Sequence, residues 1–148
     1  MSTHRTTHSS SDPYNLQRFV QAQNPVFDQV LRELRSGVKT GHWMWFIFPQ
    51  IKGLGHSPVS MEFAISSRDE ARAYLQHPVL GPRLKECTRL VLQLESRSVE
   101  EIFGSPDDMK FRSSMTLFAQ VSPEDDIFLR ALDKYFGGVP DRLTLDRL

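Results

Sequence analysis

The chain has 148 residues, the length of one ordinary domain, and its 39% hydrophobic content with ten phenylalanines excludes a chain that is disordered throughout. Eighteen Lys and Arg residues balance eighteen Asp and Glu residues, so no net charge attracts the protein to duplex nucleic acid or to an anionic membrane. The single cysteine, Cys87, excludes an intramolecular disulfide, and the longest apolar run, residues 43–48, is far shorter than the roughly 20 residues that span a bilayer. We therefore expect a cytoplasmic protein with no membrane partner and no duplex nucleic-acid partner.

Residues 1–11 are mostly Ser, Thr and His, without periodicity and without the apolar stretch of a secretion signal, so we expect a disordered tail. The fold is expected to begin at Asp12 and to form a single helical domain over residues 12–148. Helix starts are marked by a short polar residue followed by Pro, which pair an N-cap acceptor with a residue already held at helical φ. These starts are Asp12-Pro13, Asn24-Pro25, Ser57-Pro58, Ser105-Pro106 and Ser122-Pro123, with capping boxes at Ser67 with Glu70 and Ser98 with Glu101.

Apolar residues recur at helical spacing in four stretches. The stretches are residues 27–34, ending at Gly37, residues 80–94, residues 115–119, and residues 127–135, ending at Gly137-Gly138. The second keeps its spacing for almost four turns, which predicts the central core helix with Cys87 buried and inert. No segment alternates apolar and polar residues over the length of a strand. The predicted fold class is therefore all-α, a compact multihelical domain of seven or eight short helices.

The aromatic run at residues 42–48 fits either a buried strand or a buried helix. We predict a helix, because a lone strand would have no partner for its backbone groups. Thr40 is the expected cap of this helix, and Pro49 is expected to end it by excluding the helical conformation at Phe48.

Residues 41–60 join this aromatic run to a glycine loop and form the first candidate site. Gly53 and Gly55 allow positive φ and a close approach of the backbone to a ligand. The loop leads into the Ser57-Pro58 helix start, whose free N–H groups and dipole favour an anion. The neighbouring candidates, which supply hydrogen-bond donors or rings for stacking on a base or sugar, are His42, Trp43, Trp45, Gln50, Lys52 and His56.

The same residues also have structural interpretations. Trp43 and Trp45 lie two positions apart, on different faces of a helix, so at least one is expected in the core. His42 and His56 are as compatible with structural hydrogen bonds as with ligand contacts, and Lys52 is compatible with a solvated surface position. The glycine loop follows no strand and lacks a third glycine, which argues against a Rossmann-type dinucleotide site.

Residues 103–118 carry the second candidate site. Asp107 and Asp108 stand at a helix start, where they satisfy N–H groups and the positive end of the dipole, a purely structural role. Helical spacing brings Lys110 beside Ser113 and Ser114, at the border of a core-facing stripe. A small polar cluster in this position predicts the wall of a pocket.

Both segments belong to a set of motifs that covers nearly the whole chain from Asp12. The motifs are Asp12-Pro13-Tyr14, Leu16, Arg18-Phe19, the run from His42 to Gln50, Gly53-Leu54-Gly55, Ser57, Glu70-Ala71, Tyr74-Leu75, Gly81, Leu84, Ile102-Phe103-Gly104, Asp107-Asp108, Lys110, the run from Ser113 to Phe118, Tyr135 and Gly137. In these motifs the chain resembles an uncharacterised bacterial protein family, some of whose members carry the automatic label calpastatin. The resemblance implies a small multihelical fold, like that of a mycobacterial member of known structure, and no activity that can be carried over. The label is set aside here, because calpastatins are flexible inhibitor repeats and this chain has a dense aromatic core pattern.

Two functions of different classes remain open. The first is a small-molecule site that binds or hydrolyses an anionic compound such as a nucleotide or an ADP-ribose derivative. Its general base would be Asp107 or Asp108, and Lys110 would stabilise charge. The alternative is a non-catalytic binding or interaction module, and a third interpretation makes both segments simply part of the folding core.

The residues expected to converge in the ligand hypothesis are Asp108 and Lys110 as catalytic groups, with His42, Trp43, Trp45, Gln50, Lys52, Gly53, Gly55, Ser57, Ser113 and Ser114 as ligand contacts. No metal or other cofactor is expected, because the five His residues do not pair at metal-ligand spacing with each other or with Cys87. The chain also lacks the Gly-x-Ser-x-Gly elbow of serine hydrolases. The sequence does not indicate an oligomeric state.

Overall fold

The computed structural model describes residues 11–148, so the predicted tail lies, apart from Ser11, outside the described residues. The described part of the chain is helical and contains no named strand, and six of its ten helices have seven residues or more. The helices are α2 (Gln17–Gln23), α3 (Phe27–Ser36), α4 (Met44–Ile47), α5 (Pro58–Glu62), α6 (Arg68–Gln76), α7 (Leu80–Gln93), α8 (Val99–Phe103), α9 (Asp107–Val121), α10 (Ile127–Phe136) and α11 (Arg142–Leu145). The all-α multihelical prediction is confirmed. No helix within residues 11–148 has the length and apolar character needed to cross a membrane.

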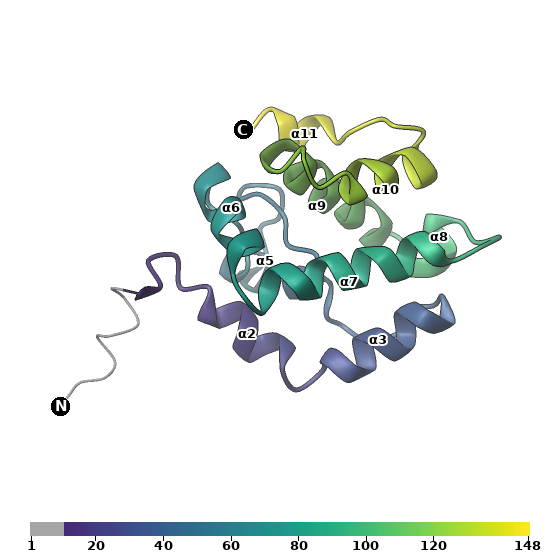
Figure 1. The fold of residues 1–148 in the computed structure, drawn as a ribbon, viewed down its shortest axis with the longest axis horizontal. Helices are drawn as coiled ribbons and strands as arrows, with labels where there is room; N and C mark the ends of the chain where they lie inside the picture. The colour runs from purple at the N-terminus through teal and green to yellow at the C-terminus, as the bar shows by residue number, and fades with distance from the viewer. Residues whose placement is uncertain (1–10) are drawn as a thin grey trace.

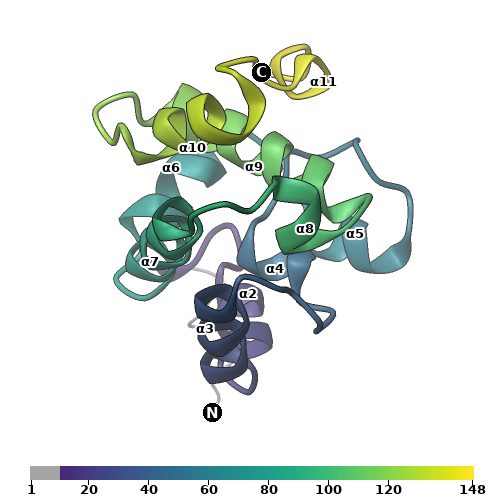
Figure 2. The same ribbon diagram turned by 90° about the vertical axis from the view of Figure 1, so that its right-hand side faces the viewer.

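Helix α7 occupies the centre of the fold, as its apolar spacing predicts. It contacts α3 on one side and α10 on the other, and α6 packs against it as well. Figures 1 and 2 show this arrangement, with α7 between α3 and the pair formed by α9 and α10. The face that α7 buries includes Leu80, Leu84, Cys87 and Val91, which lie three or four positions apart. A helix buried on several sides is therefore the scaffold on which the shorter helices are placed.

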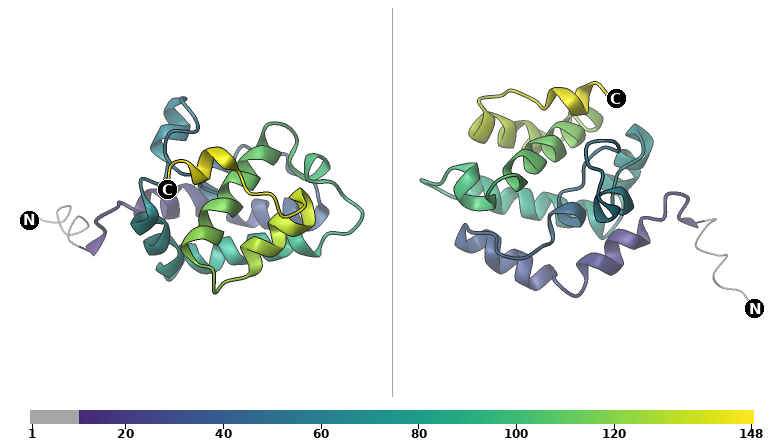
Figure 3. Two further views of the ribbon diagram at one scale, coloured as in Figure 1. Left: turned by 90° about the horizontal axis from the view of Figure 1, so that it is seen from above. Right: turned by 180° about the vertical axis from the view of Figure 1, so that it is seen from behind.

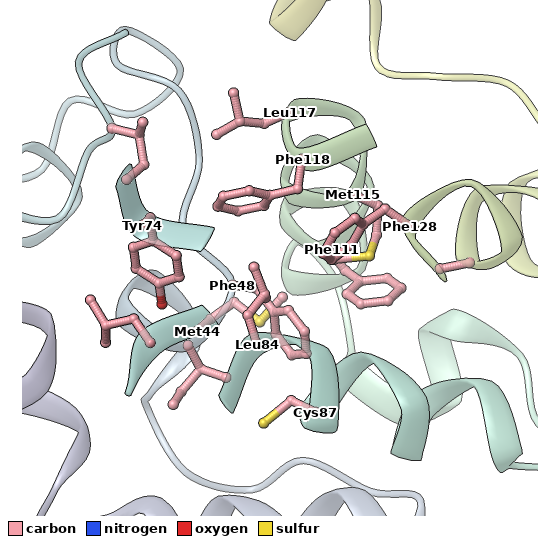
Figure 4. Close-up of a cluster of buried hydrophobic side chains, with 14 of the residues drawn as sticks. Met44, Phe48, Tyr74, Leu84, Cys87, Phe111, Met115, Leu117, Phe118 and Phe128 are labelled. Atoms are coloured by element: carbon pink, nitrogen blue, oxygen red, sulfur yellow. The ribbon is translucent and has the colours of Figure 1, made fainter. Parts of the chain in front are cut away.

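Aromatic side chains from the end of α4 and from α6, α9 and α10 fill much of the core (Figure 4). Phe48 packs edge-on against Phe111 with ring centroids 5.0 Å apart, and Phe103 stacks on Phe111 at 4.8 Å. Both arrangements are favoured geometries for ring pairs. Within the aromatic run 42–48 the buried residues are Trp43, Met44, Ile47 and Phe48, and the contact of Phe48 with Phe111 ties the first candidate segment to the helix that carries the second.

Some of the predicted signals for the start or end of a helix act as expected, and others do so only in part. Ser57 caps α5 by accepting from the N–H of Ser60, and Ser98 forms a complete capping box with Glu101. Gly37 ends α3 with a φ of 84°. Ser67 accepts from the N–H of Glu70, but the Glu70 carboxylate bonds to Ser66 and Arg18, so this box is only half formed.

Four of the five polar-Pro pairs do not begin a helix at the proline. Helices α2, α3, α9 and α10 begin at Gln17, Phe27, Asp107 and Ile127, after the prolines, and their N-cap residues make no side-chain cap. In each case the Pro lies in a turn that precedes the helix. Ser122 instead donates its hydroxyl to Asp125, which shows that a short polar residue before Pro also suits a turn.

The aromatic run forms helix α4, as predicted, but its start differs from the expectation. The N-cap residue is Trp43, with no side-chain cap, and Thr40 does not cap the helix. The backbone N–H of Thr40 donates instead to the carboxylate of Glu33 on α3. Phe48 ends the helix with φ −122° and ψ 75°, outside the helical region, as Pro49 requires.

Cys87 is buried in the core, and burial raises the pKa of its thiol to about 12. We expect no reaction with a thiol reagent at pH 8 in the native state and full reaction of the single thiol in denaturant, because only an exposed thiolate is nucleophilic. The measurement is the time course of labelling with and without urea. Rapid labelling of the native protein would contradict this placement.

Candidate functional site

A pocket with a volume of about 810 Å³ lies where six segments meet. The segments are residues 13–18 before and at the start of α2, Trp45 on α4, residues 50–55, residues 60–70 from the end of α5 into α6, the first two turns of α9, and residues 141–143 at the start of α11. The two views of Figure 3 show α11 beside α9 and the loop that carries α5 projecting from the body of the fold. The pocket thus brings both candidate segments of the sequence to one place.

Backbone hydrogen bonds hold the glycine loop in the pocket wall. The N–H of Ile65 donates to the carbonyl of Gln50, and the N–H of Lys52 donates to the carbonyl of Ile65, each at 2.8 Å. Gly53 has a φ of 100°, and Arg147 near the C-terminus donates to its carbonyl at 3.1 Å. Gly55 does not have positive φ, contrary to expectation; its lack of a side chain makes room for Ser60, which a Cβ would approach to 2.8 Å.

Arg18 holds a second part of the wall together. Its guanidinium donates to four carbonyls, those of Tyr14, Asn15, Glu62 and Ala64, and to the buried carboxylate of Glu70 at 2.9 Å. A guanidinium has five N–H groups, so every donor of Arg18 is used. Arg18 therefore joins α2 to the segment after α5 and keeps no donor for a ligand.

The cationic part of the site is a cluster of two lysines and one carboxylate. Asp107, at the first turn of α9, contacts Lys39 at 2.7 Å and Lys110 at 3.0 Å. Burial raises the pKa of the Asp107 carboxyl, but the hydrogen bonds and charges of both lysines outweigh this effect and lower it overall. Asp107 is thus held ionised, and the cluster carries one positive charge in excess.

Lys110 also lies over the ring of Trp45, with its ammonium 4.0 Å from the ring centroid. This is a cation–π contact. Trp45 and Tyr14 line the pocket, and neither makes a contact with another aromatic ring. Twelve of the chain's fifteen aromatic rings pack against one another, including Phe63, which also lines the pocket, so Trp45 and Tyr14 are exceptions.

Ser113 attaches α11 to α9 at the far end of the pocket. Its hydroxyl lies 2.9 Å from Oδ2 of Asp141, the N-cap residue of α11, and 3.1 Å from the carbonyl of Met109. The backbone N–H of Asp141 donates to the hydroxyl of Thr116 at 2.8 Å. Two hydroxyls of α9 therefore hold Asp141 at the pocket wall, one through its carboxylate and one through its backbone N–H.

Comparison with known proteins agrees with this architecture. The profile of a family described as protein of unknown function (DUF1810) matches residues 13–148. The chain belongs to this family. Among solved structures, the crystal structure of the conserved hypothetical protein Rv1873 from Mycobacterium tuberculosis is 58% identical in sequence, with a TM-score of 0.92, and the match covers 93% of this chain and 98% of that chain. No curated protein is significantly similar to this chain.

Seven of the predicted site residues line the pocket. They are Trp45, Gln50, Lys52, Gly53, Gly55, Lys110 and Ser113. The side-chain amide of Gln50 and the ammonium of Lys52 have no hydrogen-bond or ion-pair partner among the described residues, so both are free to contact a ligand.

The other five predicted residues do not line the pocket. They are His42, Trp43, Ser57, Asp108 and Ser114. His42 and Ser57 are exposed, and Ser57 acts as a cap of a single-turn helix. Asp108 accepts from the N–H of Met109 at the helix start, and Ser114 is fully buried, with its hydroxyl unpartnered. Helical phase turns Asp108 away from the face of α9 that carries Lys110 and Ser113, whereas Ser114, one turn after Lys110, lies on the buried side of that face.

Trp43 lies in the core, where it belongs to a hydrogen-bond network around Glu33 that sequence reasoning missed. Its indole N–H donates to the Glu33 carboxylate at 3.0 Å, and the backbone N–H groups of Thr40 and Gly41 donate to the same oxygen. Gln29 donates to the other oxygen at 2.6 Å. Burial raises the pKa of Glu33, but these four hydrogen bonds together lower it to about 2.

Sequence reasoning also missed Tyr14 and Asp141 as residues of the pocket. Each lies near one end of the described chain, far in sequence from both candidate segments. Tyr14 stands in the motif after Asp12, where only the family resemblance points to it. Asp141 precedes the short α11 and gives the signal of an N-cap, which has a structural meaning by itself.

Proposed function

We propose that this pocket binds a small molecule that joins a flat ring to an anionic group, such as a nucleotide or an ADP-ribose derivative. The contact of Lys110 with Trp45 at 4.0 Å carries the proposal, because it places an ammonium over the face of an indole ring that lines the pocket. A ligand of this kind places its ring on the aromatic surface and its negative charge at the ammonium.

The charge of the lysine cluster supports an anionic ligand. Asp107 is shared by Lys39 and Lys110, whose side chains are only 7% and 21% exposed. A surplus charge in a partly buried place is unfavourable unless an opposite charge accompanies it. Only one carboxylate bonds to Lys110, so an ammonium N–H remains available for an anion.

The rim of the pocket supports a ligand with an apolar surface. Met61 on α5, Met109 on α9 and Leu143 on α11 are 64%, 46% and 60% exposed, although each is a large hydrophobic residue. All three line the pocket. Apolar side chains gathered around a concavity are typical of small-molecule sites, and methionines adapt easily to the shape of a ring.

Binding is the part of the ligand hypothesis that the geometry supports best. Of the two general bases expected from the sequence, Asp108 is absent from the pocket lining, and the carboxylate of Asp107 is ion-paired with Lys39 and Lys110. The experiment therefore concerns binding and leaves hydrolysis aside.

We expect AMP and ADP-ribose to raise the thermal unfolding midpoint, because a ligand that binds only the folded state stabilises it. Adenosine, which lacks the anionic group, and inorganic phosphate, which lacks the ring, should each have a smaller effect at the same concentration. Replacing Lys110 by Gln should weaken AMP binding at least tenfold, measured by calorimetry, since a charge-assisted hydrogen bond is lost.

Lys85→Gln is the matched control, because Lys85 also pairs with an aspartate, Asp125 at 3.3 Å, but lies outside the pocket. This variant should bind AMP like the wild type. The proposal fails if neither nucleotide stabilises the wild type, or if Lys110→Gln binds AMP unchanged. In the second case the Lys110–Trp45 pair would be purely structural.

A further inference from the structure

Asp141 is a carboxylate held in position with one oxygen left open. Its Oδ2 lies in contact with the hydroxyl of Ser113 and accepts from both the backbone N–H and the hydroxyl of Thr144. Its Oδ1 has no hydrogen-bond partner among the described residues, and Asp141 lines the pocket without being fully buried. The carboxylate is thus fixed through one oxygen and presents the other.

The other acidic residues of the pocket are arranged differently. Glu70 is buried and uses both oxygens, one for Arg18 and the other for Ser66. Glu62 is exposed, and its side chain has no partner among the described residues to hold it in place. Asp141 is therefore the pocket acid that combines a fixed orientation with a free acceptor, as recognition of a ligand requires.

The position of Asp141 relative to Lys110 defines a second polar contact for the ligand. Ser113, which contacts Asp141, lies one helical turn after Lys110 on α9, so the two sit on one face of that helix. The carboxylate and the ammonium thus face the pocket from the same wall, about one turn apart. If the anionic group of a ligand binds at Lys110, the neighbouring part of the same ligand would lie at Asp141.

We infer that Asp141 Oδ1 accepts a hydrogen bond from a hydroxyl of the ligand, so that the pocket selects a phosphorylated sugar over an anionic ring compound without hydroxyls. The inference rests on the function proposed above. A neutral hydroxyl suits the position better than an amine, because Lys110 and Lys52 line the same pocket and would repel a second cation. A free carboxylate oxygen is a strong acceptor for such a hydroxyl.

The test compares AMP with 2′,3′-dideoxyadenosine monophosphate, which has the same ring and phosphate but lacks the ribose hydroxyls. The wild type should bind AMP at least tenfold more tightly than the dideoxy compound, measured by calorimetry. Asp141→Ser should bind the two equally, at the wild-type affinity for the dideoxy compound. Serine caps helices about as well as aspartate, so this variant keeps the cap of α11 while it removes Oδ1 together with the contact between Oδ2 and Ser113.

Asp146→Ser is the control just after the same short helix, where the Asp146 side chain pairs only with Arg142 at the exposed surface. It should keep the wild-type preference for AMP. Asp141→Asn is the second variant, since asparagine also caps and presents an amide in place of the carboxylate; its preference for AMP should fall as well. Thermal unfolding midpoints near that of the wild type confirm that the variants fold.

The possible outcomes separate this inference from the proposed function. If the wild type binds both compounds equally, or if Asp141→Ser keeps the preference for AMP, the inference is overturned while the ring-and-anion site stands. If the wild type binds neither compound, both the inference and the proposed function fail.

Discussion

Replacing Gly81 by Ala is expected to lower the free energy of unfolding by about 2 to 3 kcal/mol. Gly81 lies in the first turn of α7, where a Cβ would stand only 2.0 Å from the backbone carbonyl oxygen of Leu75 on α6. Backbone cannot move aside as the end of a flexible side chain does, so α6 and α7 would have to separate. Helix propensity alone predicts the opposite sign, a gain of up to about 1 kcal/mol for Ala over Gly.

The measurement is urea denaturation of the wild type, Gly81→Ala and Arg89→Ala. Arg89 is exposed on the same helix, so its replacement should change stability by less than about 0.5 kcal/mol. A stabilised Gly81→Ala protein would mean that α6 and α7 are not in close contact at this position.

Replacing Glu33 by Ala is expected to cost about 3 kcal/mol of stability. Three N–H groups, from Thr40, Gly41 and the Trp43 indole, converge on one oxygen of this carboxylate. Loss of the carboxylate leaves the buried indole N–H of Trp43 and two partly buried backbone N–H groups without their acceptor, and it frees the segment that enters α4. Arg32→Ala, at an exposed position of the same helix, is the control and should be nearly neutral.

The Glu33 contribution should depend on pH in a defined direction. The pKa of Glu33 is lowered from its usual 4.5 to about 2 in the folded protein, so the unfolded state binds more protons between these values. The contribution, about 3 kcal/mol at most from this shift, is complete above pH 4.5 and is lost as the pH falls towards 2. The stability difference between the wild type and Glu33→Gln should therefore shrink over this range. A difference that stays constant from pH 5 to pH 2.5 would contradict the network.

Individual helices could be predicted well because their signals are local. The apolar residues from Leu80 through Cys87 to Val91 recur every three or four positions, which indicates the apolar side of a helix, and this side is buried in the structure. Gly37 stops α3 because a left-handed residue ends a helix whatever the surroundings are. The pairs of a short polar residue and Pro predicted helix starts less reliably, because such a polar residue also suits the turn that precedes a helix.

The candidate site could be predicted only in part. Trp45 and Lys110 were identified because unusual residue types stand close to caps and glycines within short segments. Trp43 and Asp108 were included for the same reason, but small differences in helical phase direct Trp43 to Glu33 and leave Asp108 at the helix start. A sequence pattern without the neighbouring helices does not show which side of a segment faces a cavity.

By itself the sequence determined the all-α class, the central helix and the two segments that border the pocket, because each depends on interactions between residues a few positions apart. Only the tertiary structure decided that Tyr14, Trp45, Lys110 and Asp141 line the same pocket. These residues come from the two ends and the middle of the chain. They are brought together by contacts such as Arg18 to Glu70 and Ser113 to Asp141, which join residues 52 and 28 positions apart. Pairings at such separations depend on how the helices pack, and no local pattern records them.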